Sequence, residues 1–171
     1  NCLSILGAVD ILNGDVKVAL KALSNWKPSK GRGLRFTIPL PQGGNATLLD
    51  ESYNASPPAM KAAIKVLSDM PLTDGKRIAI LGDMLELGES GAELHISLAK
   101  ELEARHIDIV YCCGALMGEM FKKLPSSMQA LYAKDSTALF DEILPKLKAN
   151  DILLVKGSLG SRMVPVADAF I

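Results

Sequence analysis

The stretch LLDESYNASPPAM, residues Leu48–Met60, decides how the chain is organised. Its two leucines are typical of the end of a buried strand, and the carboxylates of Asp50 and Glu51 stand where that strand stops. Pro57-Pro58 can begin a helix, because proline lacks the N–H that a first helical turn leaves unpaired. The stretch therefore predicts a strand, an acidic loop and a helix. Ligands of open α/β sheets bind beside such loops, although an ordinary structural turn is an equal alternative from the pattern alone.

Segments typical of strands and of helices alternate on both sides of this stretch. We expect strands at Leu34–Leu40, Ala46–Asp50, Lys76–Leu81, Asp108–Cys113, Ala130–Ala133 and Asp151–Val155. We expect helices at Pro58–Met70, Ser90–Arg105, Leu116–Leu124 and Thr137–Lys148. A hairpin-type turn at residues 42–45 makes the first two strands antiparallel. The pattern predicts an α/β fold, a Rossmann-like three-layer domain whose mostly parallel six-stranded sheet has an antiparallel edge.

A short helical hairpin is expected before the sheet. Apolar residues at helical spacing predict helices at Asn1–Leu12 and Val16–Ser24, with Asp15 as the N-cap of the second helix. Trp26–Gly33 follows as a basic linker, since Pro28 and two glycines disfavour a helix there. The chain does not begin with methionine and enters a helical pattern at once, so we expect it to be a piece of a longer protein.

The composition excludes several classes of protein. Hydrophobic residues make up 49% and charged residues 22% of the chain, which is ordinary for a globular protein and unlike a disordered one. Nineteen basic and nineteen acidic residues cancel, so the whole chain offers no electrostatic footprint for nucleic acid. No apolar run approaches the roughly 20 residues that span a bilayer, and no signal peptide opens the chain. We expect a cytoplasmic protein without membrane insertion.

The cysteines and histidines predict neither a disulfide nor a metal centre. The chain has three cysteines, two of them adjacent in a strand-like run, and no CxxC spacing. We therefore expect Cys112 and Cys113 to be buried free thiols, as suits a reducing cytoplasm. His95 lies within an amphipathic helix and is expected to be structural.

A second polar turn follows the last expected strand. Lys156-Gly157-Ser158 offers a cation, an accessible backbone and a hydroxyl, which are the groups that hold a carboxylate or a phosphate. Neither a GxxxxGK[ST] loop nor a GxGxxG loop occurs in the 171 residues. The chain thus carries no phosphate-cradling loop of its own, and alone it is expected to be inactive.

Four stretches, taken in order, resemble the motifs of the Mur ligases, the enzymes that build the peptide of peptidoglycan. They are KGRG at Lys30–Gly33, DESYNASP at Asp50–Pro57, LGDMLELG at Leu81–Gly88 and LVKGS at Leu154–Ser158. The resemblance covers essentially the whole chain. One such motif would be weak evidence, whereas four in the same order and spacing are strong evidence.

The resemblance implies a division into domains. Residues 1–26 would be the C-terminal helical tail of a central ATP-binding domain, residues 27–33 a linker, and residues 34–171 the C-terminal Rossmann-like domain. The C-terminal domain would position the incoming amino component and close over ATP across the linker. ATP and Mg²⁺ would both be held mainly by the domain that precedes this chain.

The resemblance also implies a reaction, the ATP-dependent formation of an amide bond. The forms SYNASP and LGDMLELG favour the family member that joins D-alanyl-D-alanine to UDP-N-acetylmuramoyl-tripeptide through an acyl phosphate. A sibling ligase or a folylpolyglutamate ligase is an alternative of the same class. A non-catalytic α/β nucleotide-binding module is the alternative from another class, and the missing phosphate loop favours it.

By resemblance, particular residues would face the ligands. Those on the ATP side would be Asn1, Arg32, Asp50 and Glu51. Those at the substrates would be Asn54, Gly82, Asp83, Lys156, Gly157, Ser158 and Arg162. The sequence alone does not choose between the two neighbouring acids, a solvent-exposed first residue is nearly as good an account of the asparagine, and no catalytic or metal-binding residue is assigned.

Two positions depart from the family pattern. The family more often has a second aspartate where this chain has Glu51, whose longer side chain keeps the charge but could shift contacts to a ribose. The family commonly has KGSR followed by a methionine, whereas Leu159 stands here in the place of the arginine and Arg162 precedes Met163. Whether Arg162 supplies the missing guanidinium is left open by the sequence.

Overall fold

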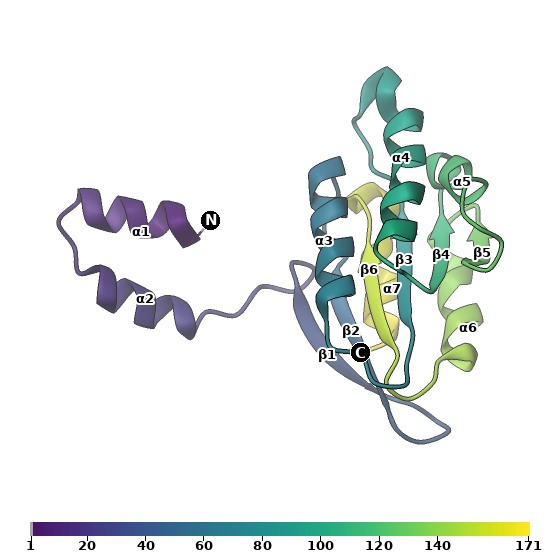
Figure 1. The fold of residues 1–171 in the computed structure, drawn as a ribbon, viewed down its shortest axis with the longest axis horizontal. Helices are drawn as coiled ribbons and strands as arrows, with labels where there is room; N and C mark the ends of the chain where they lie inside the picture. Colours follow the sequence, from purple (N-terminus) through teal and green to yellow (C-terminus); the bar gives the residue numbers. More distant parts are fainter. Residues whose placement is uncertain (1) are drawn as a thin grey trace.

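The computed structural model describes residues 2–171, so the expectation for Asn1 lies outside the described residues. The first two helices, α1 (Cys2–Ile11) and α2 (Val16–Ser24), form the expected hairpin and pack on each other. The carboxylate of Asp15 caps α2, as predicted, by accepting hydrogen bonds from two amides of its first turn. The hairpin stands apart from the rest of the chain (Figure 1), and neither of its helices contains a buried residue.

Six strands form a single sheet in the order β1-β2-β6-β3-β4-β5. Their bounds are β1 Leu34–Pro39, β2 Asn45–Glu51, β3 Arg77–Gly82, β4 Ile109–Cys113, β5 Gln129–Ala133 and β6 Ile152–Lys156. β1 and β2 pair antiparallel, and the other neighbouring strands pair parallel. The predicted α/β fold with its antiparallel edge is confirmed.

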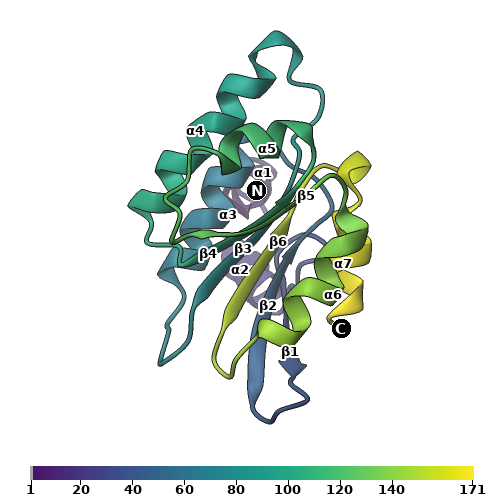
Figure 2. The same ribbon diagram turned by 90° about the vertical axis from the view of Figure 1, so that its right-hand side faces the viewer.

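Helices cover both faces of the sheet, which makes three layers (Figure 2). One face carries α3 (Pro57–Asp69), α4 (Gly91–Ala104) and α5 (Ala115–Phe121), and the other carries α6 (Leu139–Ile143) and α7 (Met163–Ala169). Strand β3 contributes to both cores, because successive side chains point to opposite faces. Ala79 and Leu81 pack in the core under α3 to α5, whereas Ile78 and Ile80 pack in the core under α6 and α7.

The last third of the chain differs from the sequence-based expectation. A helix does form within the expected range Thr137–Lys148, but it is shorter than expected, because α6 ends at Ile143 and a short 3₁₀ turn that contains Pro145 follows. Helix α7 was not expected at all. Its seven residues are too few for a periodic pattern, and its Pro165 falls in the first turn, where a helix needs no N–H.

The parallel strands bring their carboxyl ends to one edge of the sheet. The loops after β2, β3 and β4 lead to helices on one face, and the loops after β5 and β6 lead to helices on the opposite face. The loop after β6 therefore leaves this edge in the opposite direction from the loops after its two neighbours in the sheet, β2 and β3. Such a division opens a crevice at the carboxyl ends of the strands, which is where ligands bind in this class of fold.

None of the helices within residues 2–171 combines the length and the apolar character needed to cross a bilayer. The thiols of Cys112 and Cys113 are free and buried in β4, as expected, and Cys2 is free and exposed. Burial raises the pKa of both β4 thiols, that of Cys113 to about 12, and the carboxylate of Asp83 acts in the same direction. These two thiols therefore stay protonated near neutral pH and are poor nucleophiles.

We expect a thiol reagent such as Ellman's reagent to modify one cysteine per native chain, Cys2, and all three after denaturation. Burial and the raised pKa of the β4 thiols are the reason. Absorbance of the released thionitrobenzoate measures the number, and a Cys2→Ser variant serves as the control. Rapid reaction of the native Cys2→Ser chain would show that β4 opens far more readily than its burial indicates.

Candidate functional site at the carboxyl edge of the sheet

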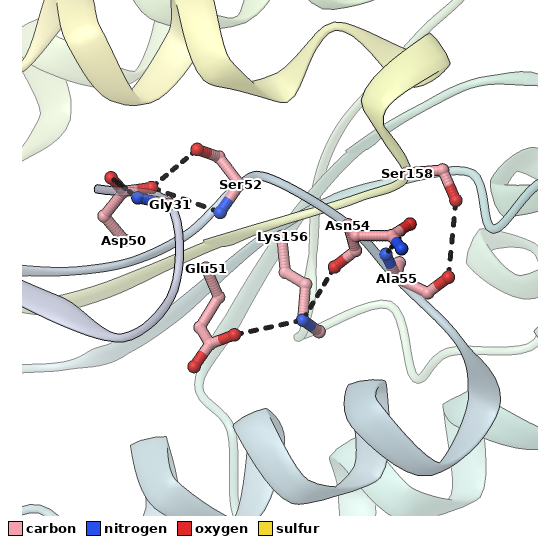
Figure 3. A network of polar contacts seen from close by, with 8 residues as sticks. All are labelled: Gly31, Asp50, Glu51, Ser52, Asn54, Ala55, Lys156 and Ser158. Atoms are coloured by element: carbon pink, nitrogen blue, oxygen red, sulfur yellow. Dashed lines mark hydrogen bonds and ion pairs between the residues drawn. The ribbon is translucent and has the colours of Figure 1, made fainter. Parts of the chain in front are cut away.

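The two neighbouring carboxylates at the end of β2 have different surroundings (Figure 3). Asp50 is fully buried. Its Oδ2 accepts a hydrogen bond from the Gly31 amide at 2.8 Å, and its Oδ1 accepts from the amide and the hydroxyl of Ser52 at 3.1 and 2.6 Å. Glu51 is only partly buried and, as the next residue of the strand, points to the other side. Asp50 thus serves the fold, and Glu51 is the carboxylate that a ligand can reach.

The end of the predicted linker is bonded to the domain. The amide of Gly33 donates to the Asp50 carbonyl at 2.8 Å, and the Tyr53 amide donates to the Gly31 carbonyl at 3.2 Å. Gly31 has φ +76° and lies so close to Tyr53 that a Cβ would come within 2.8 Å of the tyrosine Cβ, so this position requires glycine. Between the two glycines, the Arg32 guanidinium lies 4.3 Å from the centroid of the Tyr53 ring, a cation–π contact.

A cavity of about 240 Å³ opens where this linker end meets β2 and β6. We call it the linker cavity, and it is lined by Gly31, Arg32, Glu51, Tyr53, Asn54, Ala55, Ser56, Ala59 and Lys156. It brings together a guanidinium, a carboxylate, an ammonium group and a side-chain amide. Such a set can bind a polar ligand that carries both anionic and hydroxyl groups.

Lys156 and Glu51 pair across the sheet at the last positions of β6 and β2. The Lys156 Nζ lies 3.2 Å from the Glu51 Oε2 and donates to the Asn54 carbonyl at 2.9 Å (Figure 3). The lysine side chain is only 3% exposed, whereas the glutamate side chain is 30% exposed. The charge of the lysine is therefore satisfied inside the protein, and the glutamate keeps access to the cavity.

A second cavity, of about 540 Å³, lies on the other side of the same loop. We call it the loop cavity, and it is lined by residues 53–56, 85–87 and 158–160. Ser158 stands between the loops that form it. Its amide donates to the Asp83 carbonyl at 3.0 Å, and its hydroxyl accepts from the Leu85 amide at 2.9 Å and donates to the Ala55 carbonyl at 3.4 Å. Ser158 thus joins the loops after β2, β3 and β6.

Gly82 and Gly157 are required where β3 and β6 run closely side by side. A Cβ on Gly82 would come within 2.6 Å of the Ser161 Oγ, and a Cβ on Gly157 would come within 3.0 Å of the Gly82 Cα. The missing side chains leave no room for a ligand, because neighbouring residues of the same chain fill the space. Both glycines therefore allow the close packing of the crevice walls.

Asp83 and Arg162 lie at a third cavity, of about 400 Å³, lined by Asp83, Leu85, Cys113, Gly114, Ala115 and residues 134–137 and 160–162. The carboxylate of Asp83 accepts hydrogen bonds from the amides of Met117 and Leu116 at 2.7 and 3.3 Å, so it caps the start of α5. Arg162 is exposed and has the left-handed conformation, with φ +56°. Leu159 lines the loop cavity instead, so the two residues do not occupy the same place.

His95 is structural, as expected. It is fully buried in α4, where its Nε2 accepts a hydrogen bond from the Met84 amide at 2.9 Å and its Nδ1 lies 2.6 Å from the Gly91 carbonyl. The ring thereby fastens the loop after β3 to the helix that follows. This loop contributes Leu85, Glu86 and Leu87 to the wall of the loop cavity.

The structure thus sorts the residues expected from the sequence. Arg32, Glu51, Asn54 and Lys156 meet at the linker cavity. Asp50, Gly82, Asp83, Gly157 and Ser158 bond or pack within the crevice walls. Arg162 lies elsewhere, at the third cavity. Sequence reasoning did not pick out Tyr53, although a tyrosine beside two carboxylates and a basic linker was a usable signal for a cation–π contact.

We expect Asp50→Ala to lower the free energy of unfolding by about 2–4 kcal/mol, because it leaves two buried amides and a hydroxyl without their charged acceptor. Urea unfolding of the chain, followed by circular dichroism, measures this. Asp168→Ala is the matched control, since Asp168 also ties the linker to the domain, through an exposed ion pair with Lys30. The control should change by less than about 1 kcal/mol, and equal losses would contradict a special role for Asp50.

Comparison with known proteins agrees with this architecture. Residues 35–159 match the family model described as Mur ligase, glutamate ligase domain. The UDP-N-acetylmuramoyl-tripeptide–D-alanyl-D-alanine ligase of Rickettsia prowazekii is 29% identical over 99% of this chain and 36% of its own length. The ligase of the same name from Escherichia coli is 33% identical over 88% of this chain and 32% of its own length.

Solved structures show the same fold. The MurF ligase from Thermotoga maritima in complex with ADP superposes with a TM-score of 0.74 at 26% identity, over 96% of this chain and 35% of that chain. MurF from Acinetobacter baumannii gives a TM-score of 0.81 at 22% identity, over 99% of this chain and 36% of that chain. The chain thus spans about a third of the length of these relatives. Because the family model covers most of its residues, the chain belongs to the Mur ligase family, in which it matches the glutamate ligase domain.

Proposed function

We propose that this chain is the C-terminal part of an ATP-dependent ligase that adds D-alanyl-D-alanine to UDP-N-acetylmuramoyl-tripeptide. Its relatives over nearly the whole chain carry that name. The observation that carries the proposal for the site is the linker cavity, where Arg32, Glu51 and Lys156 converge from three of the stretches that resemble the family motifs. We propose that this cavity takes the nucleotide, since a relative of the same fold was solved with ADP.

The chemistry follows from the poor reactivity of a carboxylate towards an amine. Transfer of a phosphoryl group from ATP to the terminal carboxylate of the tripeptide gives an acyl phosphate and ADP. The amine of the dipeptide then attacks the acyl carbon, a tetrahedral intermediate forms, and phosphate leaves as the amide bond closes. In this scheme Arg32 stabilises charge on the nucleotide phosphates, and Glu51 accepts hydrogen bonds from hydroxyl groups of the nucleotide.

We propose that the dipeptide lies in the crevice beside the nucleotide. The loop cavity shares residues 53–56 with the linker cavity, so a ligand there would lie next to the nucleotide. Asn54 lines both cavities and offers its exposed side chain to either ligand. The internal bonds of Ser158 and the close packing at Gly82 and Gly157 support a role in shaping this crevice.

Mg²⁺ would neutralise charge on the phosphates of ATP when it is bound. No group of three ligating histidine, cysteine, aspartate or glutamate side chains occurs among residues 2–171. From the resemblance of the sequence motifs, we propose that the preceding part of the enzyme holds it. We also propose that Asn1 contacts the nucleotide, as the resemblance implies.

We also propose that the helical hairpin, residues 1–26, belongs to a preceding ATP-binding domain. Its Leu3, Ile11, Leu12 and Val18 are exposed although they are apolar, which is expected of helices that pack on a partner. Residues 30–33 are bonded to the domain, so the flexible joint would lie at residues 26–29.

The free, buried thiols of β4 fit a cytoplasmic location.

The proposed activity is tested on the full-length parent protein by ATP-dependent release of phosphate in the presence of UDP-N-acetylmuramoyl-tripeptide. We expect release to require D-alanyl-D-alanine, because the dipeptide amine displaces the phosphate. Release with D-glutamate or L-glutamate in place of the dipeptide would indicate a sibling ligase, in keeping with the wider name of the family model. No release with any amino component, together with no GK[ST] loop in the upstream sequence, would favour a nucleotide-binding module without chemistry.

We expect Arg32→Ala in the full-length enzyme to raise the KM for ATP by about tenfold, because a charge-assisted contact to phosphate is lost. Steady-state kinetics at saturating dipeptide measure this. Arg35→Ala is the control, since Arg35 is an exposed arginine of β1 that does not line the linker cavity. An unchanged KM for ATP in Arg32→Ala would remove this residue from the nucleotide site.

A further inference from the structure

We propose that Lys156 is a positioning residue: its buried ammonium group orients Glu51 and the loop of residues 52–56 towards the linker cavity, without contacting the ligand itself. The sequence led us to expect a direct substrate contact here. The inference rests on the proposed function, because the groups that Lys156 holds are those that we assign to nucleotide binding.

The first step is the burial of the charge. A charged group inside a protein is strongly unfavourable unless it is paired and hydrogen-bonded. The side chain of Lys156 is 3% exposed and ends at two acceptors, the Glu51 carboxylate at 3.2 Å and the Asn54 carbonyl at 2.9 Å. So small an exposed fraction leaves little surface for a ligand, although the residue borders the linker cavity.

The second step is the asymmetry of the ion pair. Glu51 has ten times the exposed fraction of its partner, 30% against 3%. Its Oε2 is engaged by the lysine, and its Oε1 accepts no hydrogen bond from any group among residues 2–171. One oxygen is thus fixed by the protein while the other stays available, which is how a carboxylate is aimed at a hydroxyl of a ligand.

Lys156 and Ser158 also hold the loop of residues 52–56 in place. Two successive carbonyls of the loop accept hydrogen bonds from the end of β6 and the turn after it: Asn54 from Lys156, and Ala55 from the Ser158 hydroxyl at 3.4 Å (Figure 3). The residue just before these carbonyls is Tyr53, whose ring lies under the Arg32 guanidinium. If loss of the lysine released the loop, the Tyr53 ring would move and the Arg32 guanidinium would lose its cation–π contact.

The alternative, in which the ammonium group binds the ligand directly, predicts a different pattern of energies. Groups that contact a ligand independently contribute nearly additive free energies, so the effects of their loss multiply. Two groups of which one acts through the other are coupled, and loss of both costs little more than loss of one. A double-mutant cycle on Glu51 and Lys156 therefore separates the two cases.

The cycle compares Glu51→Gln, Lys156→Met and the double variant in the full-length ligase. We expect each single variant to raise the KM for ATP by about tenfold, and the double variant to raise it by no more than about twentyfold, with the KM for the dipeptide within about twofold of wild type. An increase of about a hundredfold in the double variant, the product of the single effects, would overturn the proposal. The exposed pair of Glu119 in α5 and Lys122, the residue just after α5, is the matched control, and Glu119→Gln with Lys122→Met should leave both KM values unchanged.

Hydrogen exchange tests the positioning without any substrate. We expect Lys156→Met and Glu51→Gln each to raise the exchange rate of amides in residues 52–56 by at least about fivefold, while the amides of α4 keep their protection. Unchanged exchange in the loop of both variants would overturn the proposal even if the kinetic cycle could not be run. Failure of the wild-type enzyme to ligate would count against the proposed function alone, because the exchange result does not depend on it.

Discussion

The carboxylate of Asp50 is the constraint on which the rest of the site depends. It is buried, no cationic group among residues 2–171 lies at hydrogen-bond distance from it, and it is stabilised by the amide and hydroxyl donors of Gly31 and Ser52. Those donors come from the linker and from the loop, so one buried group fixes both segments to the end of β2. Because Arg32 is next to Gly31 and Tyr53 is next to Ser52, these bonds also determine where the two side chains lie in space. A buried charged group needs hydrogen bonds, and those of Asp50 join the linker to the loop after β2, two segments that are brought together only by the fold.

The order of the strands, and of every helix except α7, could be predicted from the sequence, because local patterns of apolar residues and of turn residues report it. The sequence also predicts a candidate site at this edge, since acids and a lysine stand where parallel strands end, and that assignment stays a prediction. The roles within the site could not be predicted. Asp50 and Glu51 are neighbours with the same chemistry, and the choice between them depends on Gly31, which lies 19 residues away along the chain. Likewise Asp83 caps a helix that begins more than thirty residues later. Such partners are set by the tertiary structure, and no local pattern contains them.

The polar groups at the carboxyl edge fall into two sets. Asp50, Asp83, His95 and Ser158 direct their hydrogen bonds inwards, to amides and carbonyls of the crevice walls. Arg32, Glu51 and Asn54 keep exposed atoms at the cavities. The bonds of the first group would hold the walls in place, so that in the proposed site the second group would bind a ligand with less loss of conformational entropy. The departure of Glu51 from the shorter aspartate is compatible with this scheme, because the Lys156 ammonium group holds one of its oxygens.

The same bonds bear on how a multidomain ligase could close. The segment from Lys30 to Gly33 is tied to the domain by the Asp50 carboxylate, by a backbone bond to Asp50 and by an ion pair to Asp168. A rotation of the hairpin relative to the sheet would therefore be taken up by residues 26–29, and Arg32 would move together with the linker cavity. Since Lys156 and Glu51 sit in paired strands of the sheet, they too would move as part of one body. In the proposed ligase, domain closure would bring a preformed half of a nucleotide site to its other half, so the cost of ordering these side chains would fall on folding and not on each catalytic cycle.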